Sequence, residues 1–355
     1  MTVEGLKDLA KKTEPVNREA YDAVIRHWDS IAKPLDGLGM FERLTARIGS
    51  IQGREDISVK NKSLLLFLSD NGVVEEGVSQ CDSEVTHKVG QAMAQGLSTV
   101  CMMAERAGVS VHPVDIGMKG DHIEGIIDKR IRDGSRNFAK EPAMTIDETL
   151  EAIETGYEEA IRLYKEGTDI LLLGEMGIGN TTTSTAVACA ILKLDPTQMT
   201  GRGAGLDIEQ SQHKGRVIEN ALRKYDLCQD DIIGILTTFG GYDIAAMTGA
   251  IAGGAHCHMP LVTDGLITLC AALTAEKLFP GTKDHCIASH VPKEPMGAHI
   301  LKELGLFAPI DAGMALGEGT GGVLLMPLLD VCLSLYDKGL PFEGLKMDPY
   351  KRFDG

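Results

Sequence analysis

Residues 174–185, GEMGIGNTTTST, place groups that can hold an anion beside a carboxylate, Glu175. The segment follows an apolar run, TDILLL, and precedes another, AVACAIL, which predicts a turn between a strand and the start of a helix. Free backbone N–H groups and the helix dipole favour an anion such as phosphate there. Alternatively, Asn180 and the threonines only cap the helix, and the glycines only form tight turns. The Gly-Lys-Ser/Thr ending of an NTPase loop is missing, which disfavours that class.

Three other segments carry groups with possible chemistry. Glu318 lies between glycines in LGEGTGG, residues 316–322, where a carboxylate can also simply favour the dipole of the following helix. The segment GRGAGLD, residues 201–207, together with Lys214, offers positive charge or is an exposed loop. The histidines of HCH at 256–258 have poor zinc spacing and are interpreted as structural, so no metal is expected. The residues alone therefore indicate an anion-binding protein with two glycine-flanked carboxylates.

The elements that must position these residues alternate between short apolar runs and amphipathic segments. This alternation, with a glycine turn after nearly every run, predicts an α/β fold with a parallel sheet and crossover helices. Ligands of such sheets bind at the carboxyl ends of the strands. We expect strands in residues 63–72, 109–117, 168–180 and 230–241, helices in residues 85–108 and 146–167, and a strand, a turn and a helix in residues 259–273.

Both ends of the chain have helical patterns. In NREAYDAVIRHWDSIA the apolar residues fall on one helical face, and the chain after about residue 300 has a helical pattern again before an irregular tail. We expect residues 1–60 and 325–355 to form a small helical domain, and residues 61–324 to form the large α/β catalytic domain.

The composition excludes several classes of protein. The 355 residues include 43% hydrophobic and 5% aromatic residues and carry a formal net charge of −16, so nucleic acid and anionic membranes are poor partners. The eight cysteines are scattered without CxxC spacing, which is typical of a reduced cytosolic protein. The N-terminal segment has no apolar signal core, and the apolar stretch at 245–262 is interrupted by His256 and His258. We expect a cytoplasmic protein.

Five segments in one order resemble a known family. GEMGIGNTTT, GRGAGLD, FGGYDIAAMTGAI, DGLI and LGEGTG together are similar to the nicotinate-nucleotide:dimethylbenzimidazole phosphoribosyltransferases, which make the lower-ligand nucleotide of cobalamin. The resemblance extends from KPLDGLG to LGEGTGGVLLMPL. It implies a Rossmann-like parallel sheet with a small helical domain built from both chain ends. It also implies transfer of phosphoribose from nicotinate mononucleotide to an aromatic acceptor, with inversion and without a cofactor.

The resemblance implies roles for individual residues. Glu318 matches the general base that takes the proton of the acceptor, and Glu175 lines the same pocket, where negative charge favours a cationic ribose. A general acid is dispensable because nicotinate leaves from a pyridinium. The residues expected to hold the phosphate and ribose of the nucleotide are Gly177, Asn180, Thr181, Gly203 and Lys214.

The acceptor side departs from the family pattern. Asn71 replaces a usual histidine, Pro292 replaces a usual serine, and Cys81 and Val89 fall where polar contacts to the base are expected. The residues expected to line the acceptor pocket are Asn71, Ser79, Cys81, Val89 and Gly317. A softer, more apolar pocket predicts a broadened acceptor range that includes phenol or p-cresol.

The resemblance also implies a two-fold dimer, either a homodimer or a heterodimer with a close paralogue. Two alternative functions remain at this stage. One is a non-catalytic paralogue subunit that binds nucleotide in a heterodimer. The weaker one is another phosphate-handling enzyme such as a kinase, because no metal-carboxylate pattern is present.

Overall fold

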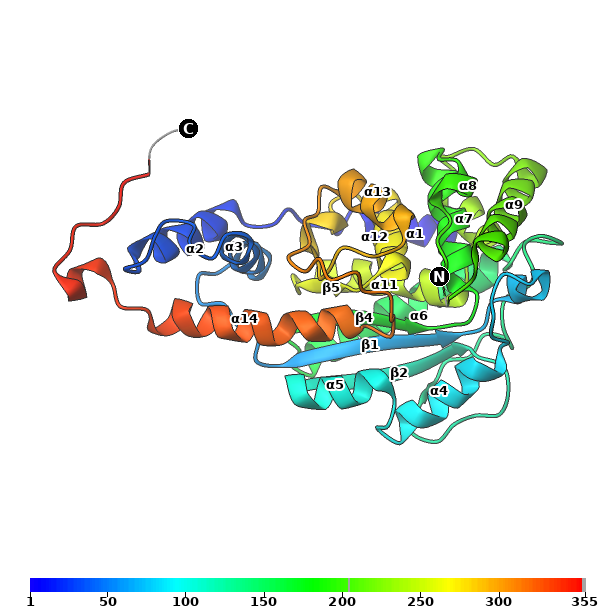
Figure 1. Cartoon of the computed structure of the whole chain (residues 1–355), viewed down its shortest axis with the longest axis horizontal. Coiled ribbons are helices and arrows are strands. Elements are labelled where there is room, and N and C mark those ends of the chain that lie inside the picture. The colour runs from blue at the N-terminus through cyan, green and yellow to red at the C-terminus, as the bar shows by residue number, and fades with distance from the viewer. Residues whose placement is uncertain (204, 353–355) are drawn as a thin grey trace.

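The computed structural model describes residues 1–203 and 205–352, and its centre is a parallel β-sheet (Figure 1). The six strands lie in the order β3-β2-β1-β4-β5-β6, and every neighbouring pair is parallel. This confirms the expected parallel α/β sheet. The strands are β1 Lys62–Ser69, β2 Val109–Gly117, β3 Ile127–Asp128, β4 Ile170–Met176, β5 Leu261–Thr263 and β6 Cys286–Ala288.

The strand order reverses between β1 and β4. The chain first moves outward through β2 and β3, then returns to pair β4 with β1, with Leu68 opposite Met176. The two strands therefore end at the same edge of the sheet, where Asp70 follows β1 and Gly177 follows β4. Open α/β sheets bind ligands in the crevice at such a reversal, so this edge is the expected position of the functional site.

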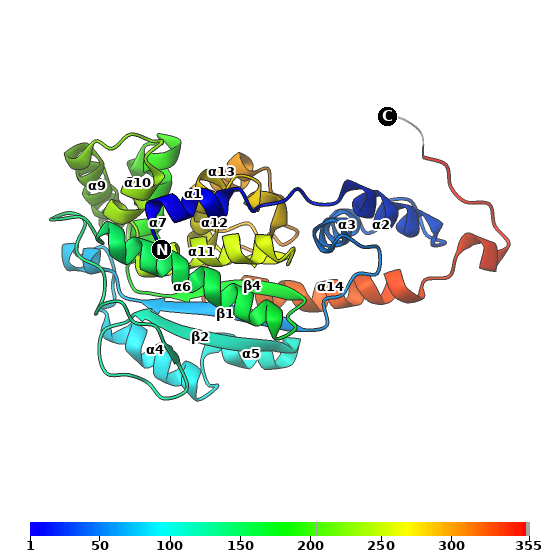
Figure 2. The same cartoon turned by 180° about the vertical axis from the view of Figure 1, so that it is seen from behind.

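Alternate residues of β1 contribute to two different hydrophobic cores because successive side chains of a strand point to opposite faces. Leu65 and Phe67 pack on one face of the sheet, and Leu64, Leu66 and Leu68 pack on the other. Figures 1 and 2 show the two layers of helices, with α14 on one side of the sheet and α6 on the other.

The helices divide between these two faces. The face of Leu65 and Phe67 is covered by α1 Val3–Ala10, α6 Ile146–Lys165, α7 Asn180–Leu192, α9 Ile208–Tyr225, α10 Ile232–Phe239, α11 Tyr242–His256, α12 Leu266–Leu278 and α13 Pro295–Leu304. The opposite face is covered by α2 Arg18–Ser30, α3 Met40–Gln52, α4 Glu84–Ala94, α5 Thr99–Ala107 and α14 Thr320–Lys338. Short connecting elements are α8 Pro196–Met199 and the 3-10 turns Gly72–Glu76, Thr282–His285 and Phe342–Leu345.

Two expectations about individual elements are wrong. Residues 230–241, expected as a strand, contain the helix α10, which Asp231 caps by accepting the backbone N–H of Gly234. The periodicity of a short continuous apolar run does not distinguish a buried strand from a buried helix. The packing of residues 232–239 against α6 and α7 therefore decides that they form a helix. Residues 85–108, expected as one helix, form α4 and α5, because the chain turns at Gly96 with a φ of +72°.

The two ends of the chain meet beyond one end of the sheet (Figure 1). Helices α2 and α3 pack on each other, and the Trp28 indole lies edge-on to the Tyr336 ring near the end of α14, with centroids 5.1 Å apart. The Ala32 N–H donates to the carbonyl of Leu340 at 2.8 Å. Helix α1 lies elsewhere, on the α6 side of the sheet (Figure 2). The division into a small helical domain (1–60 and 325–355) and a large one (61–324) stays a proposal.

Helix α14 is long and apolar enough, by length and composition, to cross a membrane. In the fold, 56% of its most apolar 18 residues are buried, and it packs against β4, α3 and α5. The stretch at 245–262, by contrast, includes most of α11, whose residues are almost all buried against α6 and α12. The stretch at 245–262 therefore has the surroundings of a core helix, whereas α14 buries one face and exposes the other.

Candidate active site

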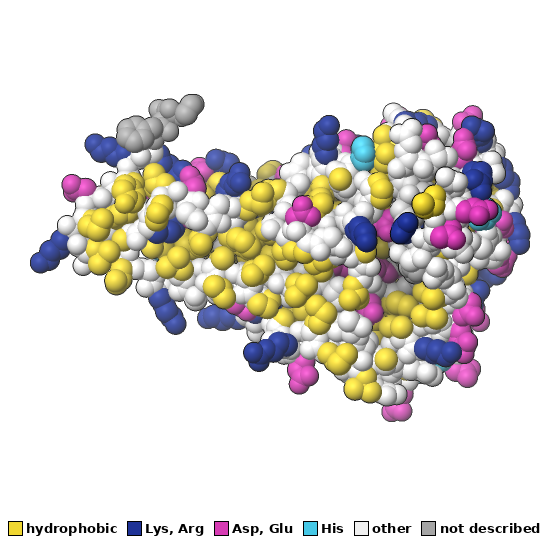
Figure 3. Space-filling model, in the orientation of Figure 1, with side chains coloured by type: hydrophobic (Ala, Val, Ile, Leu, Met, Phe, Trp, Pro, Cys, Tyr) yellow, Lys and Arg dark blue, Asp and Glu magenta, His cyan; other side chains and the backbone are white. Residues whose placement is uncertain are grey.

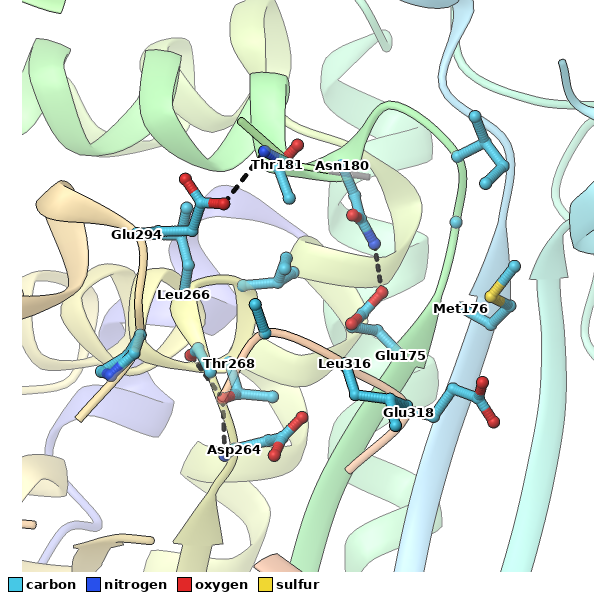
Figure 4. A pocket seen from close by; sticks show the side chains of 18 of the residues that line it. Glu175, Met176, Asn180, Thr181, Asp264, Leu266, Thr268, Glu294, Leu316 and Glu318 are labelled. Atoms are coloured by element: carbon cyan, nitrogen blue, oxygen red, sulfur yellow. Dashed lines mark hydrogen bonds between the residues drawn. The ribbon is translucent and has the colours of Figure 1, made fainter. Parts of the chain in front are cut away.

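A cavity of about 350 Å³ opens at the carboxyl ends of β4, β5 and β6. Figure 4 shows Asn180, Thr181 and Glu294 on one side of it, and Met176 and Glu318 on the other. The cavity therefore joins a polar part, near the start of α7, to a part with more apolar walls.

The polar part is built on the turn from β4 into α7. Gly179 has a φ of +95°, which lets the chain reverse within three residues so that Asn180 begins the helix. The amide of Asn180 donates to the Glu175 carboxylate and, at 3.2 Å, to Asp243 Oδ2. One amide group thus bridges two carboxyl groups, and its orientation is set by both.

Three carboxyl groups at this strand edge are buried and have raised pKa values. Burial, with the nearby Asp243 charge, raises the pKa of Glu175 well above its usual range. Burial likewise raises the pKa values of Asp243 and Asp264, although the hydrogen bonds that these groups accept lower them. Glu175 lines the cavity, and a positive charge beside it favours its ionised form.

Lys214 supplies positive charge to the polar part. It projects from α9, is only 1% exposed, and donates from Nζ to Thr181 Oγ1 at 2.7 Å. Burial lowers its pKa to about 8, while Glu294 acts in the opposite direction. Glu294 also accepts the backbone N–H of Gly203 at 3.0 Å. These contacts hold the 201–203 segment, the start of α7 and Lys214 together around one small volume.

Glu318 is held in an unusual backbone conformation. Gly317, Glu318 and Gly319 have φ values of +86°, +59° and +84°, so the only side chain in this left-handed turn is the carboxylate. Glu318 Oε2 accepts the backbone N–H of Val100, at the start of α5, at 3.4 Å. Burial raises the pKa of Glu318, and the Val100 N–H opposes that change. A carboxylate with a raised pKa is a stronger base once it is ionised.

The cavity also has apolar walls. Cys81 and Val89 line it, as expected, together with residues not anticipated there. These are Val78, Val85, Met176 and Leu316. Glu318 lies on the same side of the cavity as Met176 (Figure 4).

The structure brings most of the expected site residues to this one cavity. Its lining includes Ser79, Cys81, Val89, Glu175, Gly177, Asn180, Thr181, Gly203, Gly317 and Glu318. Lys214 is not in the lining and reaches it through Thr181. Asn71 is fully buried beneath the 177–179 turn, where its amide donates to the Ile178 carbonyl at 3.4 Å, and so it supports the wall rather than lining it. Pro292 does line the cavity.

Sequence reasoning did not single out Asp243, Asp264 or Glu294. The turns that carry the first two, TFGGYD and TDG, end apolar runs, and polar residues at such ends are the available signal. Glu294 had no comparable signal, because its role depends on the approach of residues 201–203 from a distant part of the chain. Within residues 1–203 and 205–352, no group of three His, Cys, Asp or Glu side chains is arranged to hold a metal ion.

Residues 13–344 match the family model described as phosphoribosyltransferase. The chain belongs to this family. An enzyme of Clostridium acetobutylicum named nicotinate-nucleotide–dimethylbenzimidazole phosphoribosyltransferase is 36% identical over 348 residues, which cover 98% of this chain and 99% of the relative. CobT from Thermus thermophilus superposes with a TM-score of 0.88 at 33% identity, covering 93% of this chain and 99% of that structure. The chain is thus a phosphoribosyltransferase with an α/β fold, and its substrates are small molecules.

Proposed function

We propose that this phosphoribosyltransferase moves phosphoribose from nicotinate mononucleotide to an aromatic lower-ligand base for cobamide synthesis. The observation that carries the proposal is the two-part cavity. For the phosphate it has a helix start, with Lys214 buried behind Thr181, and for the ring it has apolar walls and Glu318. The names of similar enzymes supply the donor and the acceptor class.

The proposed reaction is a displacement at C1′ of the ribose. The acceptor attacks C1′ from the apolar side while the bond from C1′ to the nicotinate nitrogen breaks on the opposite side. Nicotinate takes the bonding electron pair and leaves as a neutral ring nitrogen, so it needs no proton. Glu318 takes the proton that the acceptor loses, from a ring N–H or a phenolic O–H, and Glu175 lies where positive charge builds up on the ribose.

We expect a broad acceptor range. Because Cys81, Val89 and Met176 offer few hydrogen bonds to a second ring heteroatom, the pocket separates aromatic acceptors mainly by shape. Shape differences of this size discriminate by only about 1–3 kcal/mol. With limiting nicotinate mononucleotide and equal amounts of dimethylbenzimidazole and p-cresol, we expect both α-ribotides, measured by mass spectrometry. Formation of the dimethylbenzimidazole product alone, even when that base is scarce, contradicts the prediction.

The same product analysis tests the function itself. Release of nicotinate that requires both an acceptor and the enzyme supports phosphoribosyl transfer to that acceptor. Absence of any α-ribotide across benzimidazoles, purines and phenols contradicts the proposed reaction. That result would favour the alternative of a non-catalytic subunit. The arrangement of Glu175, Lys214 and Glu318 around one cavity does not support that alternative.

We also propose that the enzyme works as a homodimer. Figure 3 shows apolar side chains gathered on one face, over α14 and the adjoining helical end of the molecule. The exposed apolar residues of α14 recur at helical spacing along one stripe, which the tail continues. They are Leu324, Leu328, Val331 and Leu335, followed by Leu340, Leu345 and Met347. An extended apolar face of this kind marks a protein interface, and an identical copy satisfies it with two-fold symmetry.

Val331, 70% exposed, is the residue to change. The enzyme is expected to sediment as a dimer and the Val331→Asp variant as a monomer, because an unpaired charge within an apolar interface costs several kcal/mol, or more than about 100-fold in affinity. Ile146→Asp, at an exposed position on α6 across the sheet, is the matched control and leaves the dimer intact. A monomeric parent enzyme would contradict the proposal, and a dimer only with an added paralogue would favour a heterodimer.

We place the reaction in the cytoplasm. All eight cysteines are free in the structure, which fits a reducing compartment.

A further inference from the structure

Asp264 connects the end of β5 to the start of α14. Its carboxylate is 2% exposed and accepts two backbone N–H groups, from Gly319 to Oδ2 at 3.0 Å and from Gly321 to Oδ1 at 2.7 Å. Helix α14 begins after a glycine, so no side chain of its own caps it. A carboxylate from a distant strand therefore satisfies the free N–H groups of this helix start.

The side chain of Asp264 is itself held in place. Its backbone N–H donates to Thr268 Oγ1 at 2.7 Å, a contact drawn in Figure 4. His290 lies beside it, with its Nδ1 3.8 Å from Asp264 Oδ1 and 3.0 Å from Ser289 Oγ. The carboxylate thus has little freedom to turn away from α14.

The two N–H groups that Asp264 binds lie one and three residues after Glu318. A non-glycine residue in the left-handed region is strained, so the surroundings must hold Glu318 there. Gly174 of β4 packs directly under this turn, since a Cβ at that position would lie 2.9 Å from the carbonyl oxygen of Glu318. Asp264 holds the turn from one side and β4 supports it from the other.

We propose that Asp264 is a positioning residue for Glu318: by fixing the N–H groups of Gly319 and Gly321, it sets the left-handed turn that directs the Glu318 carboxylate to the acceptor side of the cavity. The proposal rests on the role of Glu318 as base in the proposed function. An amide does not substitute for the carboxylate, because its NH₂ group would face one of the two backbone N–H donors.

Asp264→Asn is the direct test. We expect kcat to fall roughly 10–100-fold, as for a displacement of about 1 Å at a reacting group, with KM for nicotinate mononucleotide within about three-fold of the parent value. Asp231→Asn is the matched control, because Asp231 also caps a helix, α10, but lies outside the cavity lining. It is expected to lose only stability. An unchanged kcat in the folded Asp264→Asn enzyme overturns the proposal, as does a rise in KM without a fall in kcat.

A double-variant cycle separates this proposal from the assignment of the base. If Asp264 acts through Glu318, the Asp264→Asn/Glu318→Gln enzyme is no slower than Glu318→Gln alone. Losses that multiply would show an independent role for Asp264 and overturn the proposal. Near-parent turnover in Glu318→Gln alone would instead overturn the base assignment, whatever Asp264→Asn does.

If Asp264→Asn does not fold, Thr268→Val serves in its place. This change removes the acceptor of the Asp264 N–H and keeps the carboxylate. We expect a smaller fall in kcat, about 3–10-fold, again with KM nearly unchanged. No change in kcat overturns the proposal.

Discussion

Replacing Glu318 with Gln is expected to lower turnover by roughly 10²–10⁴-fold, the usual contribution of a positioned general base. Gln keeps the size and the left-handed turn but cannot take the proton of the acceptor. Binding of nicotinate mononucleotide should stay close to that of the parent enzyme, because the phosphate and ribose contacts lie in the other part of the cavity. Steady-state kinetics with dimethylbenzimidazole, together with calorimetry for the nucleotide, measures both quantities.

The pH dependence gives the same experiment a second readout. Only the ionised carboxylate accepts a proton, and burial raises the pKa of Glu318 above its usual range. Turnover should therefore fall as the pH drops through that raised pKa, and this acidic limb should disappear in Glu318→Gln. Glu303→Gln is the control, because Glu303 forms an exposed pair with Lys277 on the surface. Near-parent turnover in Glu318→Gln would mean that the acceptor attacks without a base from this residue.

Replacing Lys214 with Met is expected to weaken nicotinate mononucleotide by roughly 10–100-fold, the range for losing a hydrogen bond to a charged group. Met keeps the buried stem and removes the ammonium. Nicotinate riboside lacks the phosphate, so its affinity should change less than about three-fold. Calorimetry with the two ligands measures the difference, and Lys302→Met, an exposed lysine on α13, is the control. Equal losses for both ligands would mean that Lys214 serves the ribose or the fold instead.

The charge of Lys214 should also be visible as a pH effect. Burial lowers its pKa to about 8, so the side chain is cationic below that pH and neutral above it. Nucleotide affinity should therefore decrease as the pH rises through about 8, with a smaller decrease for the riboside. The Lys214→Met enzyme should lose this difference between the two ligands.

Much of the fold was predictable from local patterns. The buried strands β1 and β4 are continuous apolar runs closed by turns, β2 mixes apolar and polar residues and ends at Gly117, and α6 has a strong helical period. Helix α10 was not predictable in the same way, because an apolar run of eight residues is equally suited to a strand and to a helix in a protein core. The packing of α6 and α7 against this run favours a helix, and only the folded chain brings those helices to it.

Some features of the candidate site were likewise predictable from local sequence, and others depend on the fold. The sequence alone determined that Glu175 and Glu318 lie in glycine-rich turns at element ends, because glycine spacing and apolar runs are local properties. It also predicted an anion site near Asn180, which stays a prediction. Only the tertiary structure decided that Asn180 bridges Glu175 to Asp243, and that Lys214 reaches Thr181.

The same holds for the support of the base. The left-handed turn at Glu318 depends on Asp264, which lies 55 residues before Gly319 in the chain and joins it only because β5 ends beside the start of α14. Neither residue's local sequence encodes that approach, since it follows from the order of strands in the sheet. Local sequence therefore determined which chemical groups stand at the element ends, and sheet topology decided which of them meet, because the approach of distant segments depends on packing of the whole chain.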